Sequence, residues 1–266
     1  MAWKKYYIAS MKYIRYGAIC LYYLSFKRYY LSITSKMDKN DAFIKVGRPW
    51  ARHTAKIFEF DIKVIGLERW RLAAKSQLIL IANHRSFFDQ FILAAVSPAS
   101  FLMPCHEKYL KIPVLGGFLK FLGFFGVKKG KLSKEDTLKV KEHLSSGTSF
   151  AIYPEGTRGY GNKLLPFRGG AFQWAAQANA PILPLYIFNS EQVMSKRRSL
   201  FDLNPADIIV VVGNPVTIRN DFVALDMKKA ETDYAVEYQY LYSTYESKPN
   251  QESRYRETNK LFEGQI

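Results

Sequence analysis

The sequence predicts an α/β protein in which a mainly parallel central sheet is flanked by helices. Two observations carry this prediction. Apolar runs of strand length alternate along the chain with segments of helical periodicity. Several of those runs are apolar throughout, which is typical of strands covered on both faces. At 266 residues with 48% hydrophobic residues, the chain is long enough for one such domain with an appendage.

The predicted elements of this domain begin at Phe60. The strands are Phe60–Ile65, Leu78–Ala82, Phe124–Val127, Phe150–Tyr153, Ile182–Phe188 and Ile208–Val212. The helices are Phe87–Val96, Pro113–Leu122, Lys134–Leu144, Ala171–Asn179 and Asp221–Tyr245. Ser133 followed by Asp136 predicts a capping box for the third of these helices. The segment after them, from Ser247 to Ile266, is polar enough to be a loose tail.

Positive charge and aromatic residues are concentrated at the N-terminus. The formal net charge is +16, and residues 1–56 contribute +10 of it, with 12 Lys and Arg residues against Asp38 and Asp41. Ten Trp, Tyr and Phe residues lie between Trp3 and Tyr30. Basic residues interleaved with aromatic ones are typical of a bilayer interface, so the expected partner is a phospholipid membrane. Nucleic acid is not expected, because the charge is gathered at one aromatic end instead of forming a stripe.

The N-terminal segment predicts helices that lie on a membrane. Its longest uncharged run, Tyr16–Phe26, is about half of the ~20 residues that a span requires. A helical wheel separates two sectors, one with Lys4, Lys5, Lys12 and Arg15, the other with Trp3, Tyr7, Ile14 and Leu21. A polar break is expected at Ser35–Asp41 and a second helix as far as Ile57. The alternatives are a helix that only packs on the domain, and a signal peptide, although no cleavage site follows Phe26.

His84 is the first candidate catalytic residue. It lies in the run Asn83-His84-Arg85-Ser86-Phe87-Phe88-Asp89, directly after a predicted strand, and ligands collect at that end of a parallel strand. A neutral imidazole can remove the proton of an alcohol at neutral pH, and Asp89 could accept Nδ1–H and leave Nε2 free as the base. In isolation, the same residues would more simply describe a histidine that caps or packs at a strand end.

A second polar cluster follows another predicted strand. Tyr153-Pro154-Glu155-Gly156-Thr157-Arg158 supplies a carboxylate, a hydroxyl and a guanidinium that can hold a phosphate with two hydrogen bonds. Downstream, Arg168 precedes Gly169 and Gly170 at the start of a predicted helix, and helix N-termini attract anions. A plain Pro-Glu-Gly turn is the alternative. Together the two strand ends predict a base and two arginines around one phosphorylated substrate.

These motifs resemble those of the 1-acylglycerol-3-phosphate O-acyltransferases, also called lysophosphatidic acid acyltransferases of the PlsC type. The resemblance covers about Phe60 to Val216, in the family's order. The matching segments are Asn83-His84 to Asp89, Ile112-Pro113-Val114-Leu115-Gly116, Tyr153 to Arg158 and Ala180-Pro181-Ile182-Leu183-Pro184. Each motif alone is weak, but their ordered combination is specific.

The resemblance implies a glycerol-3-phosphate acyltransferase-like fold and assigns roles residue by residue. His84 and Asp89 would be the catalytic pair. The acceptor's glycerol-phosphate end would be bound by Glu155, Gly156, Thr157, Arg158, Arg168 and Lys129. The donor would be acyl-CoA or acyl-carrier protein, with no metal or other cofactor. Residues 1–57 would then associate with the membrane, residues 58–220 would form the catalytic domain, and residues 221–266 a C-terminal helix and polar tail.

Two departures from the family pattern keep alternatives open. Lys129 stands where the family usually has arginine, and lysine keeps the charge but loses the planar fork, so the acceptor could be another lysophospholipid or a lyso-aminolipid. His106 falls in a segment where lysines are usual and is not expected to act as a second base. A third reading is a non-catalytic lipid-binding protein with the same fold.

Two further expectations concern location and the acyl chain. The expected location is the cytoplasmic face of the inner membrane, as a peripheral or monotopic protein, and Cys20 and Cys105 are too few for a disulfide framework. The aromatic stretch from Val114 to Val127 is explained either by core packing or by an acyl-chain groove.

Overall fold

In the computed structural model, residues 2–27, 29, 39–113, 115–127, 134–160, 163–196, 199 and 201–245 are described. Their central sheet has six strands in the order β1-β8-β7-β2-β6-β3. These are β1 (Phe60–Ile65), β8 (Ala206–Val212), β7 (Ile182–Phe188), β2 (Ile79–Ala82), β6 (Ser149–Ile152) and β3 (Phe101–Leu102). Only the β7–β8 pair is antiparallel within this sheet. The predicted class, a mainly parallel α/β sheet flanked by helices, is confirmed.

Alternate residues of the strands face two separate cores. Leu80 and Ala82 of β2 point to a core shared with α4 (Arg48–Phe58) and α6 (Asp89–Val96). Ile79 and Ile81 point to the opposite core, which is closed by α9 (Lys134–Ser145), α10 (Gly170–Ala178) and α12 (Val223–Tyr245). Because side chains alternate along a strand, a strand covered on both sides must be apolar at every position, as all of β2 is.

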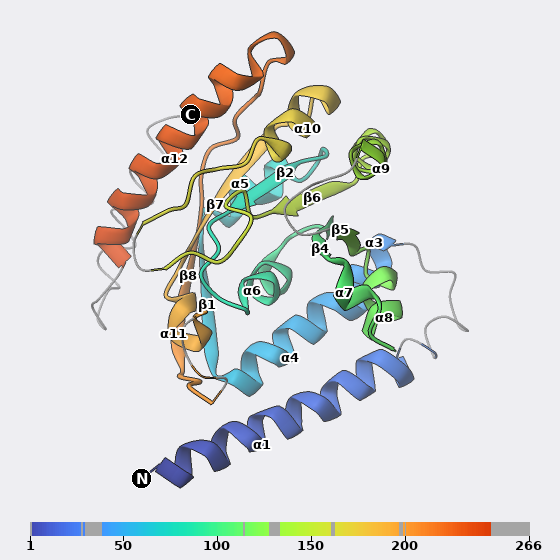
Figure 1. The fold of residues 1–266 in the computed structure, drawn as a ribbon, viewed down its shortest axis with the longest axis vertical. Helices are drawn as coiled ribbons and strands as arrows, with labels where there is room; N and C mark the ends of the chain where they lie inside the picture. Colours follow the sequence, from blue (N-terminus) through green and yellow to red (C-terminus); the bar gives the residue numbers. More distant parts are fainter. Residues whose placement is uncertain are drawn as a thin grey trace.

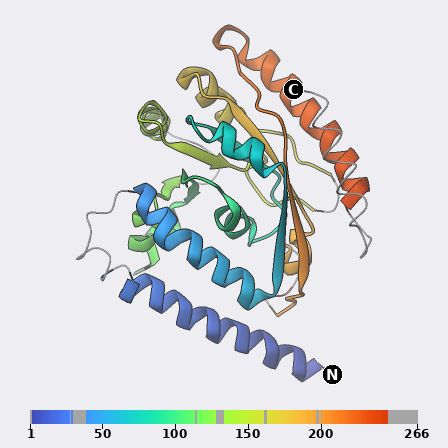
Figure 2. The same cartoon turned by 180° about the vertical axis from the view of Figure 1, so that it is seen from behind.

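The layers are visible in Figure 1, where α4 and α1 (Ala2–Leu21) lie on one side of the sheet and α12 on the other. The view from behind shows the same separation (Figure 2). Helix α1 packs on α4 through aromatic contacts. The ring of Tyr16 is stacked 6.4 Å from Trp50, and the rings of Tyr13 and Tyr16 make edge contacts with Phe58. The N-terminal helix therefore does pack on the domain.

Several short elements were not predicted. They are α5 (Leu67–Ala73), β4 (Pro104–His106), α7 (Glu107–Leu110), α11 (Ser190–Met194) and η3 (Asn220–Phe222). The predicted second helix as far as Ile57 is confirmed as three consecutive helical elements, α3 (Lys39–Ala42), the π-helix η2 (Phe43–Gly47) and α4, the first of which begins inside the predicted polar break Ser35–Asp41. Helix α1 also continues as a π-helix, η1 (Tyr22–Lys27). The predicted strand at Phe124–Val127 exists as β5 (Phe125–Val127), but it pairs with β4 in a separate two-stranded sheet. An apolar run shows that a strand forms, not which partner it finds.

Core packing accounts for part of the aromatic stretch between the motifs. In α8 (Leu115–Phe121) the side chain of Phe118 is buried and its ring lies 5.1 Å from that of Trp50, and Leu122 is buried just after the helix. Lys129, Val114, Ser133 and the tail from Ser247 lie outside the described residues. The division into residues 1–57, 58–220 and 221–266 stays a prediction.

Candidate active site

The strands that precede the two polar motifs, β2 before Asn83–Asp89 and β6 before Tyr153–Arg158, lie side by side, so the two motifs meet. Strands β2 and β6 are parallel neighbours, with Ile81 opposite Ile152, so His84 and Tyr153 follow at the same edge of the sheet. Two hydrogen bonds join the loops: the backbone N–H of His84 donates to Glu155 Oε1 at 2.9 Å, and that of Gly159 donates to the His84 carbonyl at 2.8 Å. Arg158 precedes Gly159 directly, so the predicted phosphate loop lies against the histidine.

His84 is paired with Asp89. Its Nδ1 lies 2.7 Å from Asp89 Oδ2, which also accepts the backbone N–H groups of Arg85 at 2.7 Å and Ser86 at 2.8 Å. Asp89 is the first residue of α6 and is fully buried, whereas the side chain of His84 is 18% exposed. A carboxylate oxygen that accepts from three donors is held in place. Nδ1–H therefore points to Asp89, and Nε2 is left for a substrate.

Tyr153 fixes the plane of the imidazole. The two rings are stacked with centroids 4.0 Å apart and an angle of 9° between them. Burial raises the pKa of Tyr153 well above its usual value, and the charge of Asp89 raises it further, so the phenol stays neutral. Stacking on one face and a carboxylate at Nδ1 leave the histidine ring with little freedom to turn.

Glu155 joins three segments of the site. Its Oε1 accepts from His84 N–H, and its Oε2 accepts from Leu165 N–H at 2.9 Å. Burial raises the pKa of Glu155, while these two N–H groups and the charge of Arg85 oppose that shift. The carboxylate is thus occupied by backbone donors in this structure. Its predicted contact with a substrate stays a prediction.

Arg168 lies over the Glu155–Arg158 loop. Gly156 has φ +68°, and a Cβ atom there would come within 2.6 Å of Arg168 Nε. The backbone conformation therefore favours glycine, and any side chain at this position would displace the guanidinium of Arg168. Thr157 is exposed and its hydroxyl lies 3.4 Å from Nζ of Lys196. Gly156 and Arg168 are thus brought together, and Thr157 and Arg158 follow Gly156 in the same loop, whereas Lys129 lies outside the described residues.

Three residues at the site were not predicted as participants. Arg85 is buried, and its Nη2 donates to the carbonyl of Lys163 at 2.8 Å. Lys196 follows α11 and stands beside Thr157, with its ammonium 5.1 Å from the ring centroid of Tyr160. Tyr234 of α12 reaches the backbone of Asn83. Arg85 lies within the Asn83–Asp89 motif and could have been proposed from the sequence. Lys196 and Tyr234 reach the site through tertiary packing, which no local sequence pattern encodes.

Comparison with known proteins places the central region in a known class. Residues 61–188 match the family model described as Acyltransferase. More particularly, the chain is 33% identical over 165 residues to the 1-acyl-sn-glycerol-3-phosphate acyltransferase of Saccharomyces cerevisiae, covering 60% of this chain and 53% of that protein. The resemblance predicted from the motifs, to the lysophosphatidic acid acyltransferases, is confirmed.

Two further relatives bear on acceptor and fold. The Lyso-ornithine lipid O-acyltransferase of Brucella abortus is 28% identical over 140 residues, which is 49% of this chain and 50% of that protein. The crystal structure of the 1-acyl-sn-glycerophosphate (LPA) acyltransferase, PlsC, from Thermotoga maritima superposes with a TM-score of 0.66 at 18% identity, covering 85% of this chain and 96% of the other. This likeness confirms the fold. The chain spans about half the length of the yeast and Brucella proteins.

Proposed function

We propose that this protein transfers a fatty acyl group from a thioester of coenzyme A or acyl-carrier protein to the free hydroxyl of 1-acylglycerol-3-phosphate, giving phosphatidic acid. The observation that carries the proposal is the His84–Asp89 pair, 2.7 Å apart, hydrogen-bonded through its backbone to the Glu155–Gly159 loop. A base on one strand end and basic side chains on the next suit a substrate with a hydroxyl near a phosphate. The similarity to the yeast enzyme supports the same acceptor.

The chemistry requires only groups of this chain. Nε2 of His84 takes the proton of the acceptor hydroxyl as its oxygen attacks the thioester carbonyl, and Asp89 stabilises the imidazolium that forms. When the tetrahedral intermediate collapses, the carbon–sulfur bond breaks and the imidazolium returns the proton to the leaving thiolate. Arg158, Arg168 and Lys129 hold the phosphate, with Lys196 close to Thr157. No metal or other cofactor takes part in the proposed reaction.

The proposed site of action is a membrane surface. The outward face of α1 exposes Trp3, Tyr7, Ile14 and Leu21, each at least 60% accessible.

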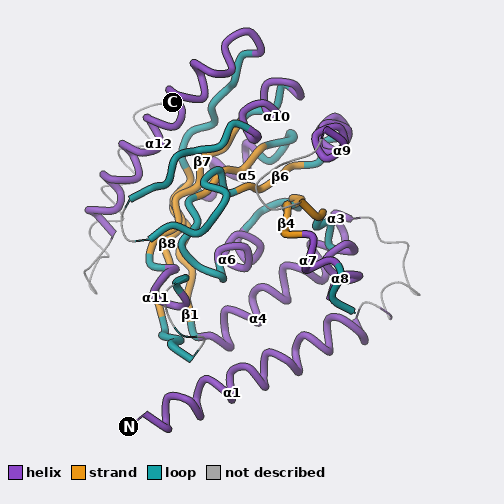
Figure 3. The backbone as a smooth tube through the Cα atoms, viewed as in Figure 1, coloured by secondary structure: helices purple, strands orange, loops and turns teal. Residues whose placement is uncertain are grey.

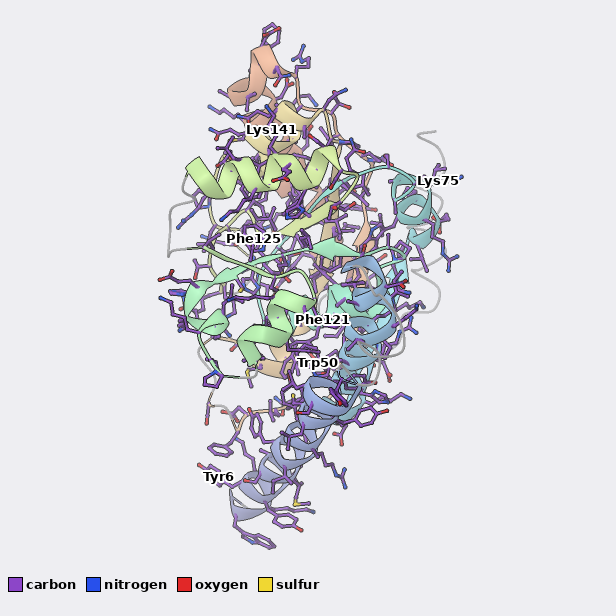
Figure 4. All side chains as sticks on the ribbon, turned by 90° about the vertical axis from the view of Figure 1, so that its right-hand side faces the viewer. Tyr6, Trp50, Lys75, Phe121, Phe125 and Lys141 are labelled. Carbon is purple, nitrogen blue, oxygen red and sulfur yellow. The ribbon has the colours of Figure 1, made fainter. Side chains whose placement is uncertain are left out.

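The predicted basic sector of α1 is only partly exposed. Lys12 is buried and paired with Glu59 at 2.8 Å, and Lys5 pairs with Asp202, so two of its four residues face the protein. Figure 4 shows Tyr6 at the tip of α1, far from Lys141 on α9. Among the described residues, no helix combines the length and apolarity that crossing a bilayer requires.

A liposome-based transfer assay tests this function. Vesicles with 1-acylglycerol-3-phosphate would be supplied with labelled acyl-CoA and, separately, labelled acyl-carrier protein, and phosphatidic acid would be measured. Labelled phosphatidic acid with either donor is expected. No labelled product from any donor would contradict the proposal and favour a lipid-binding protein without activity.

Two observations support a lyso-aminolipid as the second candidate acceptor. Lys129 replaces the usual arginine of the family, and one relative is named for a lyso-ornithine lipid. A lyso-aminolipid carries no phosphate, so a site that prefers it should depend less on Arg158 and Arg168. Running lyso-ornithine lipid, 1-acylglycerol-3-phosphate and lysophospholipids with larger headgroups side by side would rank them by kcat/KM. We expect 1-acylglycerol-3-phosphate to have the highest kcat/KM of these acceptors.

A further inference from the structure

One face of α12 contacts the two motif loops at three points. Glu231, Tyr234 and Tyr238 are spaced by three and four residues and therefore share a side of the helix. Tyr234 contacts Asn83, the ring of Tyr238 lies 5.6 Å from the guanidinium carbon of Arg85, and Glu231 Oε1 accepts the backbone N–H of Phe167 at 2.7 Å. Each contacted residue is the chain neighbour of His84 or Arg168. In Figure 3 the loop between β6 and α10 passes beside α12.

Tyr234 makes the most enclosed of these contacts. Its hydroxyl accepts the backbone N–H of Asn83 at 2.8 Å and donates to the carbonyl of Leu185 at 2.7 Å. The residue is almost fully buried, with its ring 4.4 Å from that of Tyr186 and 5.2 Å from that of Phe167. A buried N–H and a buried carbonyl would both lose their partner if this hydroxyl were removed.

Asn83 carries that contact to the catalytic histidine. Its side chain forms two hydrogen bonds with the backbone of Ile187, each 2.7 Å, so the end of β2 is fastened to β7 by the side chain and to α12 by the main chain. His84 is the next residue, and its Nδ1 must stay within 2.7 Å of an aspartate that is fixed separately on α6. Movement of Asn83 by a fraction of an ångström changes that geometry directly.

We propose that Tyr234 and Glu231 are positioning residues, which connect α12 to the two halves of the site: Tyr234 sets the place of His84, and Glu231 that of Arg168. The inference rests on the proposed acyl transfer. Helix α12 lies outside the matched region of residues 61–188, so it is a part of the molecule to which the family match assigns nothing. Neither side chain is proposed to touch the substrate. Both act through the backbone of the neighbour of a site residue.

The substitution Tyr234→Phe isolates the hydroxyl. The ring keeps its packing while Asn83 N–H loses its acceptor, so kcat is expected to fall about 10- to 100-fold, the scale expected for misplaced catalytic groups, with KM for both substrates within about twofold. Tyr240→Phe is the matched control, because Tyr240 lies on the same helix and its ring is 53% exposed. It should leave kcat and the thermal midpoint unchanged.

Glu231 gives an independent test that does not depend on a buried tyrosine. Glu231→Ala removes the acceptor of Phe167 N–H beside Arg168, so KM for the phosphorylated acceptor is expected to rise about 5- to 20-fold while kcat changes little. Glu231→Gln keeps a carbonyl oxygen and should restore KM. If the Tyr234→Phe protein does not fold, the KM values of Glu231→Ala and Glu231→Gln still test whether α12 positions the site.

Unchanged kcat in a folded Tyr234→Phe protein, or no rise of KM in Glu231→Ala, would overturn the inference while wild-type turnover stands. Absence of wild-type turnover would instead overturn the proposed function, and the inference with it. If the apparent kcat of Tyr234→Phe falls only in proportion to the fraction of folded protein, Tyr234 has a structural role only, and the inference is overturned.

Discussion

At the scale of single residues, the site is organised by backbone donors as much as by side chains. Asp89 holds His84 and two N–H groups of the same loop, and Glu155 holds the loop from the other side. The two carboxylates thereby fix the histidine from α6 and from the end of β6. Substitutions at these positions can separate the charge of a group from its shape.

Asp89→Asn tests whether the charge of Asp89 is needed. The amide oxygen can take the place of Oδ2 and keep its three donors, since Oδ1 has no hydrogen-bond partner among the described residues. The negative charge that is proposed to stabilise the imidazolium is lost, so kcat should fall about 10²- to 10⁴-fold. The amide N–H groups at the position of Oδ1 are buried without an acceptor among the described residues, so the thermal midpoint should fall as well. Combining it with His84→Ala should lower kcat no further than His84→Ala alone, because the two act as a unit. Additive losses would show that they do not.

Gly156→Ala tests the contact between Arg168 and the Glu155–Arg158 loop, which is proposed to bind the acceptor's phosphate. A methyl group at φ +68° strains the backbone by about 1 kcal/mol and displaces Arg168, so KM for the acceptor should rise about tenfold. Gly147→Ala is the matched control, because Gly147 has φ +83° with nothing within 4 Å. It should lose similar stability without any change in KM. Equal kinetics in the two variants would contradict the role given to Arg168.

At the scale of elements, packing between short helices is tight where glycine permits it. A Cβ atom on Gly116 of α8 would lie 2.1 Å from the backbone oxygen of Leu110 at the end of α7. Backbone cannot move aside as a flexible side chain can, so the two helices could not keep their present approach.

Gly116→Ala should therefore lower stability by about 1–3 kcal/mol, as overpacking does. Gly17→Ala is the opposite case, because Gly17 lies inside α1 with nothing within 4 Å. Alanine there should raise helix stability by up to about 1 kcal/mol. Thermal unfolding of both variants measures the difference. A stable Gly116→Ala protein would mean that α7 and α8 are not packed as described.

The elements that could be predicted from sequence are those with a complete local pattern. The apolar runs at β2 and β7 and the periodicity of α10 identify themselves, because a strand covered on both faces and a helix with one buried side each leave a repeating signature. Strands such as β3 have only two residues and carry no such pattern. The elements η1 and η2 lie in segments predicted to be helical, but no residue pattern there distinguishes a π-helix from an α-helix.

The site shows the same division. His84, Asp89 and the Glu155–Arg158 loop could be predicted because each follows a recognisable strand, and neighbouring parallel strands end at one edge. The antiparallel partner of β7, and Tyr234, which lies 151 residues from Asn83 in the chain, depend on packing across the sheet. No local pattern contains such information.

At the scale of the whole molecule, the sheet separates two surfaces. One side carries α4 and α1 with its exposed aromatic face, and the other carries α12 (Figures 1 and 2). The exposed face of α1 has the amphipathic rings and alkyl side chains that partition into a bilayer interface.

Replacing Trp3, Tyr7 and Ile14 together by serine should weaken binding to anionic vesicles by about tenfold or more, because less apolar surface enters the lipid. Leu72, Leu138 and Val236 form a matched control set, since each is about 65% exposed on another helix. Replacing these three by serine should leave vesicle binding unchanged in a sedimentation assay. Equal losses for the two sets would argue against α1 as the membrane face.

The role of His84 as the base is tested most directly by the turnover of purified His84→Ala in the liposome assay, with His84→Gln as a second variant. We expect kcat to fall by about 10²- to 10⁴-fold or more, while the circular dichroism spectrum and vesicle binding match those of the wild type. Turnover retained within a few-fold of wild type by a folded, vesicle-bound variant would contradict the assignment of His84 as the base.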